Sequence, residues 1–374
     1  AGLDRIMMGA PVWVDAETVL IKAGDRGQTR LLRASLNGEA AFVYPTDRFH
    51  EVALFAAAGG RLVLSLDSPQ TGPDLYTLPA ANPTNADPVR LTAINEAVVG
   101  ERSLARYERI EFTGSYGDTV EGLVAVPAGW TPEAGPAPLI VSIHGGPMAY
   151  DAPNFKFIHQ YWAGMGYMVL MVNYHGSISY GEAFTESIRG QWGPAEHGDL
   201  EAGVDALVAR GWADPNRLFV TGFSQGGIMT NWAVGHTDRF QAAVSEHGMW
   251  NYRMSYGTDD CHNWWQDDYG VPWQNGEAYA KASPASAVEN IKTPTLIMAG
   301  EVDWRCPLVE SEQMYVSLKK RGVPTQLVVW QGEWHALSKP RRMIDRIRRI
   351  CNWFAQYGGI AFDDNTAEGY PDLD

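Results

Sequence analysis

From about residue 108 onward, short apolar segments alternate with longer segments that have the periodicity of amphipathic helices. The strand candidates are 139–143, 168–172, 218–221, 242–245, 295–299 and 326–330, and the helix candidates are 155–165, 199–210, 227–235, 308–321 and 341–357. Such alternation requires a mostly parallel sheet that is covered by helices on both faces. Active sites in these sheets lie at the carboxyl ends of the strands. The pattern therefore predicts an α/β domain over residues 106–360.

Residues 1–105 have a different character, with short strand-like runs interrupted by Gly, Pro, Asn and Asp. Two similar runs, 31–38 and 75–81, lie about 44 residues apart, which is the spacing of one four-stranded propeller blade. A β-sandwich is the alternative. At most about two blades fit this length, and two blades cannot close a ring, so their edges would be unpaired. We predict an incomplete β-propeller, its C-terminal portion, for 1–105, and an acidic tail for 361–374.

The segment GFSQG at 222–226 fits the pattern G-x-S-x-G. It follows the apolar run LFV at 218–220 and precedes a helix-forming stretch, which is the strand–turn–helix context of a nucleophile elbow. The glycines allow a tight turn, which holds Ser224 in a strained conformation above the sheet. The positive end of the following helix favours negative charge at this point. The motif predicts an α/β-hydrolase fold with Ser224 as the nucleophile.

A serine hydroxyl needs a base that removes its proton, and the base needs an acid that orients it. In this fold the chain order is Ser, then Asp or Glu, then His. We predict His335 as the base, because it alone among the downstream histidines follows a late strand and lies in a loop, GEWH at 332–335. The alternatives are His236 in the helix after the elbow, His247 at a strand end beside the cleft, and His262 in a polar, Trp-rich loop.

The acid is expected at the end of the strand 295–299, where the sequence continues GEVD over 300–303. Asp303 is the preferred candidate and Glu301 is its competitor; a salt bridge or helix cap is the structural alternative. The oxyanion hole needs two donors. One is the backbone N–H of Gln225, after the nucleophile, and the other is expected from the glycine-rich loop HGGP at 144–147.

Together these motifs resemble the prolyl oligopeptidase family, in particular its acylaminoacyl-peptidase branch. The resemblance runs from about residue 74 to 357. Besides the elbow it includes IHGGP at 143–147, NYHGSISYG at 173–181, WG at 192–193, Asp199, DPNR at 214–217, TPTLIMAGEVDWRCP at 293–307 and GEWHALSKP at 332–340. It implies a β-propeller joined to an α/β-hydrolase domain. It also implies cleavage of short peptides, release of blocked amino-terminal residues or hydrolysis of simple esters, with no metal or organic cofactor.

The resemblance also implies roles for individual residues. Ser224, Asp303 and His335 match the catalytic triad, and Gly146 and Gln225 match the oxyanion donors. Arg305 matches an arginine that grips a substrate carbonyl, a task that suits a fixed guanidinium fork. The alternative for Arg305 is a structural salt bridge.

The sequence departs from the family pattern in three ways. Gln225 stands where Tyr or His is usual, which keeps the backbone donor but changes the edge of the pocket. His175 stands where Arg is common in the motif N-x-R-G-S. Family members also carry a whole propeller. We therefore expect the chain to be one fragment of a longer polypeptide, either truncated or processed, with a second chain or a missing N-terminal segment completing the propeller.

Residues 248–273 are unusually rich in aromatic side chains and follow the strand beside the elbow. In similar enzymes the pocket for the acyl-side residue lies there, so we expect an apolar or aromatic preference. Trp250 and Tyr256 are the substrate-binding candidates. Packing in the core or in a lid is the alternative for each ring.

Composition limits the partners and the compartment. A formal net charge of −15 repels phosphate backbones, which argues against nucleic acid. Three widely spaced cysteines without a CxxC pair argue against a zinc site or disulfide framework, so we predict no metal and a cytoplasmic location, with a periplasmic or secreted one as the alternative. The apolar runs are too short to span a bilayer, so no membrane association is expected. Assembly as a homo-oligomer is a further possibility that composition does not decide.

The preferred function is that of a serine peptidase acting on short peptides or N-acylated peptides. A carboxylesterase that uses the same triad is the first alternative. A dipeptidyl-peptidase-like aminopeptidase is the second, although it needs acidic residues that grip a free amino terminus. A non-catalytic binding protein is disfavoured because the Ser, Asp and His set is intact.

Overall fold

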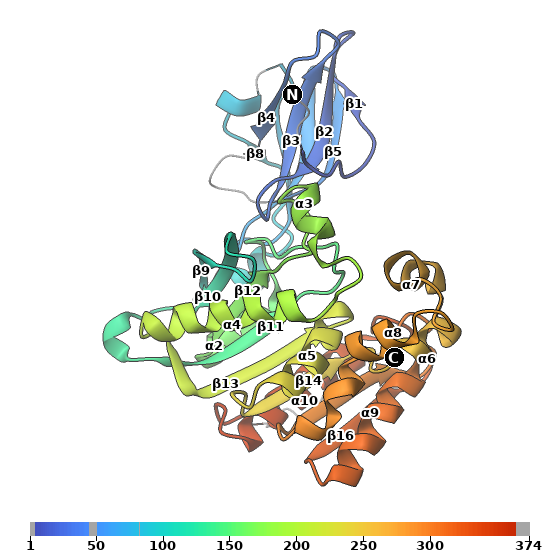
Figure 1. The fold of residues 1–374 in the computed structure, drawn as a ribbon. Helices are drawn as coiled ribbons and strands as arrows, with labels where there is room; N and C mark the ends of the chain where they lie inside the picture. Colours follow the sequence, from blue (N-terminus) through green and yellow to red (C-terminus); the bar gives the residue numbers. More distant parts are fainter. Residues whose placement is uncertain (1–3, 45–50, 82, 364–374) are drawn as a thin grey trace.

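The structure is a computed structural model that describes residues 4–44, 51–81 and 83–363. Within these residues the chain forms two four-stranded sheets followed by one eight-stranded sheet. Figure 1 shows the two small sheets at the top and the large sheet with its helices below them. The sequence prediction of a partial β-propeller ahead of an α/β-hydrolase domain is confirmed. Of the predicted acidic tail, residues 364–374 lie outside the described residues.

Each small sheet is an antiparallel meander of the kind that forms a propeller blade. The first contains β1 (Val12–Trp13), β2 (Thr18–Gly24), β3 (Thr29–Ser35) and β4 (Ala40–Tyr44). The second contains β5 (Glu51–Ala58), β6 (Arg61–Asp67), β7 (Asp74–Pro79) and β8 (Val89–Arg90), with a 3₁₀ turn at Pro83–Asn85 and helix α1 (Glu96–Val99) nearby in the chain. Burial alternates along β6 and β7, as expected when one sheet face is packed. Leu20, Leu31, Leu62 and Leu64 share one apolar cluster, so the two blades pack on each other.

The large sheet has the strand order β16-β15-β14-β13-β11-β12-β10-β9. Its strands are β9 (Arg106–Thr113), β10 (Thr119–Val126), β11 (Ala137–Ile143), β12 (Met168–Asn173), β13 (Ala213–Phe223), β14 (Ala242–Glu246), β15 (Thr295–Gly300) and β16 (Thr325–Trp330). β9 and β10 form an antiparallel hairpin, and β10 runs antiparallel to β12. The six strands β12, β11, β13, β14, β15 and β16 are parallel and pair in this order. The chain therefore reverses its direction of travel across the sheet at β11, which is where an open sheet forms its crevice.

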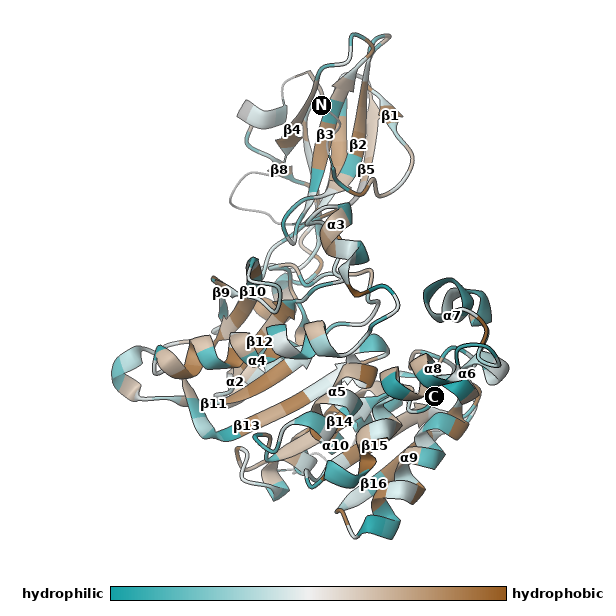
Figure 2. Cartoon of the chain, in the orientation of Figure 1, coloured by the Kyte–Doolittle hydropathy of each residue, from teal (hydrophilic) through white to brown (hydrophobic). Residues whose placement is uncertain are grey.

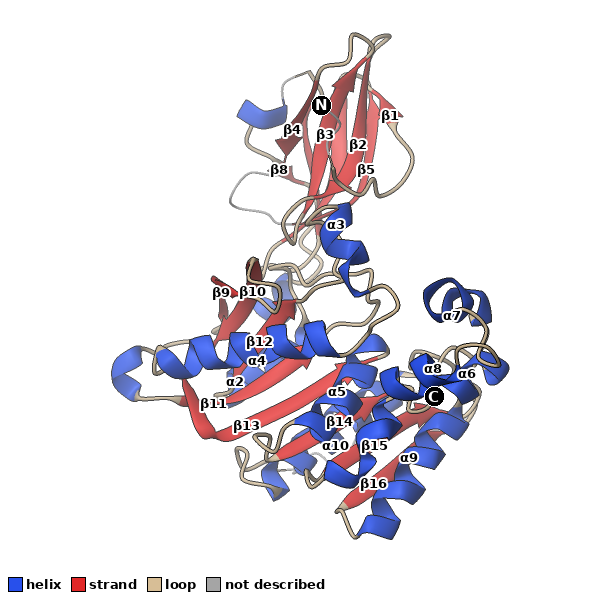
Figure 3. Cartoon of the chain, in the orientation of Figure 1, coloured by secondary structure: helices blue, strands red, loops and turns tan. Residues whose placement is uncertain are grey.

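Helices cover both faces of the large sheet (Figure 3). They are α2 (Phe157–Met165), α4 (Pro194–Ala209), α5 (Gln225–His236), α9 (Leu308–Arg321) and α10 (Pro340–Gln356), joined by the short α3 (Glu182–Thr185) and 3₁₀ turns at Pro132–Ala134, Glu186–Ile188 and Pro284–Asn290. Between β14 and β15 the chain also forms α6 (Tyr252–Thr258), α7 (His262–Tyr269) and α8 (Gly276–Ala282). These last three helices were not predicted. Their aromatic rings form a separate cluster, with Tyr252, Trp265, Tyr269 and Tyr279 buried in it.

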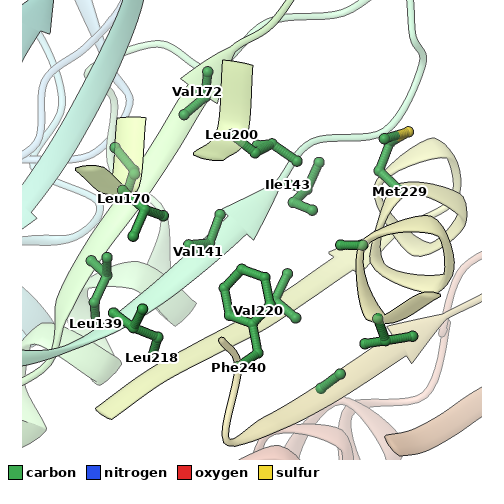
Figure 4. Close-up of a cluster of buried hydrophobic side chains, with 14 of the residues drawn as sticks. Leu139, Val141, Ile143, Leu170, Val172, Leu200, Leu218, Val220, Met229 and Phe240 are labelled. Atoms are coloured by element: carbon green, nitrogen blue, oxygen red, sulfur yellow. The ribbon is translucent and has the colours of Figure 1, made fainter. Parts of the chain in front are cut away.

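Strand periodicity divides the core into two layers. Leu139, Val141 and Ile143 of β11 face one apolar cluster, whereas Ile140 faces the other. Successive strand side chains point to opposite faces, so a strand buried on both sides is continuously apolar. Figure 2 shows these strands in the hydrophobic colour, and Figure 4 shows the first cluster packed between strands and the helices α4 and α5. No helix in the described part of the chain is both long and apolar enough to cross a membrane.

Candidate active site

The nucleophile elbow lies where β13 ends and α5 begins. Ser224 connects Phe223 to Gln225 and has φ 60° and ψ −121°. A positive φ is strained for a residue with a Cβ, and it persists only where the surroundings hold it. Here the Ser224 N–H donates to the carbonyl of Glu246 at 2.9 Å, and the Ser224 carbonyl accepts from the N–H of Ile228 at 2.9 Å. Hydrogen bonds to β14 and to α5 therefore hold Ser224 in this strained backbone conformation.

Two glycines of the motif are required by close backbone packing. A Cβ at Gly222 would lie 2.3 Å from the carbonyl oxygen of Gly226. A Cβ at Gly226 would lie 2.0 Å from the carbonyl oxygen of Ile143, the last residue of β11. Both distances are far below van der Waals contact, so neither position has room for a side chain.

The structure brings Ser224, His335 and Asp303 together. Nε2 of His335 lies 2.9 Å from Oγ of Ser224. Nδ1 of the same ring lies 2.9 Å from Oδ2 and 3.1 Å from Oδ1 of Asp303. These three side chains come from the loops after β13, β15 and β16, and adjacent parallel strands end at the same edge of the sheet. The arrangement allows the imidazole to take the hydroxyl proton while the carboxylate orients it.

The competing candidates are placed elsewhere. Glu301 accepts a hydrogen bond from the backbone N–H of Gly332 at 2.8 Å, so it closes the loop rather than facing Ser224. His236 bonds the carbonyl of Trp232, one turn back in α5. His262 is exposed in α7. His247 is different, because its ring reaches the Asp303 carboxylate.

Asp303 is fully buried and holds a dense set of hydrogen bonds. Its Oδ1 accepts from the backbone N–H groups of Arg305 and Cys306, each at 2.9 Å. Burial raises the pKa of this carboxyl, but hydrogen bonds from His247 and His335 and from the Cys306 N–H outweigh it, so the pKa is lowered overall. Asp303 is therefore ionised at neutral pH and can steady an imidazole that gains a proton.

His247, Asp303 and His335 are also of the residue types that bind metals, and one potential ligand atom of each lies within 4.8 Å of the others. Those atoms are already engaged with one another in hydrogen bonds. The cluster is accounted for as a hydrogen-bonded network without a cation.

The loop 144–147 passes directly against the nucleophile. A Cβ at Gly145 would lie 3.2 Å from Cβ of Ser224, and Gly146 lines the same cavity as Ser224 and Gln225. His144 fixes the loop: its Nε2 lies 3.1 Å from Oγ of Ser177, and its ring stacks on Tyr174 with centroids 4.3 Å apart. The loop residue Gly146 and the first residue of α5, Gln225, thus border the same small space beside Ser224.

That space is a cavity of about 30 Å³ with mainly apolar walls. Trp192, Trp264 and Trp265 form part of the wall, with ring centroids 5.5 Å apart between Trp192 and Trp264 and 5.2 Å apart between Trp192 and Trp265. The remaining lining residues include Ile228, Met249, Cys261, Arg305 and Cys306. A cavity of this volume has room for little more than a water molecule.

The substrate-binding candidates Trp250 and Tyr256 do not line this cavity. Trp250 is 2% exposed and belongs to the main core below the sheet edge. Tyr256 packs against Trp273 and Tyr279 in the aromatic cluster. From the aromatic-rich segment, the residues that line this cavity are Trp264 and Trp265 of α7, together with Met249 and Cys261. Trp192 was missed as a pocket residue, although its WG motif was visible in the sequence.

Arg305 lines the cavity at its exposed end. Its Nε and Nη2 donate to the carboxylate of Asp260 at 2.6 and 3.3 Å, and its side chain is 40% exposed. Arg305 forms a salt bridge, as one interpretation expects, and it also borders the space beside Ser224.

The side chain of Gln225 points away from the pocket edge. Its Nε2 lies 3.5 Å from Oε1 of Glu196, a buried residue of α4. Glu196 also accepts a hydrogen bond from the Gly193 N–H at 2.7 Å, and burial raises its pKa to about 8. The side chain of Gln225, which stands where Tyr or His is usual, is thus directed toward α4.

His175 forms a buried bridge behind the active-site loops. Its Nδ1 lies 2.7 Å from Oδ2 of Asp199 and its Nε2 3.1 Å from Oδ2 of Asp118. The ring is 2% exposed. Burial lowers the pKa of His175, but the hydrogen bond to Asp199 and the charges of Asp199 and Asp118 raise it by more, so the pKa is raised overall. His175 thus occupies the position where arginine is common in the family, but the charge of His175 depends on pH.

A mostly parallel sheet with a strained serine at a strand–helix turn, an imidazole on its hydroxyl and a buried carboxylate behind the imidazole defines a serine hydrolase of the α/β-hydrolase fold. The chain belongs to the prolyl oligopeptidase family, because residues 153–360, more than half of its length, match that family.

Individual relatives agree with this membership. The chain is 33% identical over 368 residues to the uncharacterized peptidase YuxL of Bacillus subtilis, covering 95% of this chain and 55% of the relative. It is 28% identical over 286 residues to dipeptidyl-peptidase 5 of Schizosaccharomyces pombe, covering 74% and 42%. Among solved structures, the acylaminoacyl peptidase of Pyrococcus horikoshii superposes with a TM-score of 0.86 at 26% identity, covering 99% of this chain and 58% of the other. The chain spans about half the length of the relatives it matches.

Gly226→Ala is expected to disrupt the elbow. The added Cβ must push either β11 or α5 aside, and such overpacking costs about 1–3 kcal/mol of unfolding free energy. Hydrolytic activity is expected to be lost as well, because Ser224 moves with the turn. Denaturant unfolding and a chromogenic ester assay measure the two effects.

Gly164→Ala in α2 is the matched control, since a Cβ there meets nothing within 4 Å. It is expected to be neutral or to stabilise the helix by up to about 1 kcal/mol. Equal unfolding free energies for the two variants would contradict this account of the motif.

The His175 bridge predicts a pH-dependent stability. Because the folded-state pKa of His175 is raised, its stabilising contribution is fully present below the ordinary pKa of about 6.5 and is lost as the pH rises through the folded-state value. His175→Gln should therefore lower the unfolding temperature more at pH 6 than at pH 9. Thermal unfolding at both pH values measures this difference.

His236→Gln serves as the comparison, because the His236 ring bonds a backbone carbonyl rather than a carboxylate. A His175→Gln effect that is the same at pH 6 and pH 9 would show that the bridge carries no additional charge in the folded state.

Proposed function

We propose that this chain carries the catalytic domain of a serine peptidase that hydrolyses short peptides or N-acylated peptides through an acyl-enzyme on Ser224. The observation that carries the proposal is the continuous line of contacts from the Ser224 hydroxyl through His335 to Asp303, with distances of 2.9 and 2.9 Å. Membership of the prolyl oligopeptidase family supports the peptide substrate class.

The reaction proceeds in two acyl-transfer steps. His335 accepts the proton of Ser224 as Oγ attacks the substrate carbonyl, and Asp303 stabilises the imidazolium that forms. The backbone N–H groups of Gln225 and Gly146 receive the negative charge on the tetrahedral oxygen. His335 then donates its proton to the leaving amine. In the second step water attacks the acyl-enzyme, and His335 accepts the proton of the water and returns it to Oγ of Ser224. Arg305, beside the cavity, is proposed to bind a substrate carbonyl through the guanidinium edge that faces away from Asp260.

A dipeptidyl-peptidase specificity is the second candidate, because several relatives of this chain carry that name, including the one from Schizosaccharomyces pombe. A carboxylesterase that uses the same residues is the third. Three matched substrates separate them: an N-acyl amino-acid anilide, the corresponding nitrophenyl ester, and a dipeptide anilide with a free amino terminus. Hydrolysis of the ester alone would overturn the peptidase proposal.

We also propose that the blades of residues 1–105 belong to a larger propeller that a missing N-terminal segment or a second chain completes, ahead of the catalytic domain at 106–360. Support comes from the length of the relatives and from the inability of two blades to close a ring. A cytoplasmic location is proposed on the basis of three free cysteines. Assembly as a homo-oligomer stays a prediction.

Ser224→Ala is expected to lower kcat on the order of 10⁶-fold, because the remaining groups have no nucleophile to activate. The variant should also fail to react with a fluorophosphonate probe, which measures the nucleophile directly. Ser286→Ala, an exposed serine outside the site, should retain full labelling and activity. Undiminished turnover in the Ser224 variant would contradict the mechanism.

The narrow cavity predicts that small apolar acyl-side residues are favoured over aromatic ones. This replaces the expectation of an apolar or aromatic preference with one for small side chains: the methyl group of alanine is about as large as the water molecule that a cavity of about 30 Å³ holds, whereas a phenyl ring must displace the tryptophan walls. We expect kcat/KM to be about 10–200-fold higher for an alanyl than for a phenylalanyl acyl group. Anilide substrates that differ only in this residue provide the measurement.

Trp264→Ala should widen the cavity and reduce or reverse this preference, because Trp264 is a partly buried wall residue. Trp273→Ala is the matched control, since Trp273 is 71% exposed and does not line the cavity. An unchanged preference in the Trp264 variant would show that another surface selects the acyl group.

A further inference from the structure

His247 occupies a strained position next to the triad. It follows β14 directly and has φ 50°, a conformation that is unfavourable for a residue with a Cβ. Its backbone N–H donates to the carbonyl of Met298 in β15 at 2.8 Å. Its side chain is 2% exposed, whereas that of His335 is 17% exposed. The strand that neighbours the nucleophile strand thus ends in a bent residue whose ring is directed inward.

The ring of His247 is bonded to the triad carboxylate. Its Nδ1 lies 2.7 Å from Oδ2 of Asp303, the same oxygen that lies 2.9 Å from Nδ1 of His335. The two imidazoles meet edge to face, with centroids 5.6 Å apart and planes at 86°. Phe223 packs against both, at 5.1 and 5.0 Å. One carboxylate oxygen therefore lies within hydrogen-bonding distance of two histidines that pack on each other and on a common aromatic neighbour.

The two oxygens of Asp303 are held from opposite directions. Backbone N–H groups of Arg305 and Cys306 hold Oδ1, and His247 holds Oδ2. Without His247, only His335 itself would restrain Oδ2, and the carboxylate could rotate with the imidazole that it is meant to orient. Glu246, the residue before His247, is paired with Arg346 of α10.

We propose that His247 is a positioning residue of this active site: it locks the Asp303 carboxylate and limits the negative charge that Asp303 presents to His335. The proposal rests on the proposed function, because it concerns the same triad. His247 makes no hydrogen bond to Ser224 among the described contacts and acts through Asp303.

Two variants separate the hydrogen bond from the packing of the ring. His247→Phe keeps a flat ring but removes the donor, whereas His247→Asn places an amide N–H near the position of Nδ1 and tolerates a positive φ. For the Phe variant we expect kcat to fall about 10- to 100-fold with little change in KM, because the imidazole is less well oriented. The Asn variant should recover most of kcat.

The pH profile provides a readout that a purely structural role would not move. With one donor removed, Asp303 presents more negative charge to His335, which then keeps its proton to higher pH. The acidic limb of kcat/KM should therefore move upward by about half a pH unit or more in His247→Phe, and should return toward the wild-type position in His247→Asn. A Phe variant with wild-type kcat and an unmoved acidic limb would overturn the proposal, as would an Asn variant no better than Phe.

A measurement on the wild-type chain keeps the test independent of how the variants fold. Proton NMR with ¹⁵N-labelled histidine should show strongly downfield imidazole N–H signals from His247 and His335, which both bond Asp303, as well as from His175, which bonds Asp199, and the absence of the His247 signal would overturn the proposal. Fluorophosphonate labelling of the wild-type chain identifies a failure of a different kind. Absence of labelling would overturn the proposed function, whereas labelling together with unaltered His247 variants would overturn only the role of His247.

Discussion

A buried negative charge on Asp303 organises the active site. A carboxylate withdrawn from water is strongly destabilising unless donors surround it. Asp303 meets this demand with two backbone N–H groups of its own loop and with imidazoles of His247 and His335. Those histidines follow β14 and β16, the two neighbours of β15. The single carboxylate therefore ties together the loops of three adjacent parallel strands, and the triad is aligned as a consequence of satisfying that charge.

The nucleophile side of the site is built on a different principle. There the constraint is steric: Gly226 leaves only enough room for the backbone of β11, and Ser224 is forced into a positive φ that hydrogen bonds from β14 and α5 maintain. Strain of this kind survives only in a rigid setting. The sheet supplies that setting, because residues 139–141 of β11 and 218–220 of β13 are buried and pack into apolar clusters on both faces. Electrostatic satisfaction on one side and close packing on the other thus fix the 2.9 Å contact between Ser224 and His335.

Much of this arrangement could be predicted because it follows local periodicity. The helix predicted at 308–321 has those bounds as α9, and the elbow was recognisable from its glycines and the preceding strand. The excursion between β14 and β15 was not predictable, since the helices α6, α7 and α8 are short and their rings pack on one another rather than on the sheet. Which aromatic ring faces the nucleophile depends on how α7 returns to it, and that is a tertiary property. For the same reason the contact between His247 and Asp303 could not be read from two strand ends 56 residues apart.

The shape of the site follows from what the excursion packs against. Trp192, from the loop before α4, packs against both Trp264 and Trp265, so the wall of the cavity beside Ser224 forms only where the excursion and that loop meet. Widening the cavity would require repacking of the whole aromatic cluster, and densely packed rings resist such movement. Two other tryptophans are exposed: Trp304 is 68% exposed and Trp334 50% exposed, each adjacent in sequence to a triad residue. Trp192, Trp264 and Trp265 therefore give the space beside Ser224 a stiff, narrow wall, and the shape of that wall is set by the excursion between β14 and β15 rather than by the sheet edge alone.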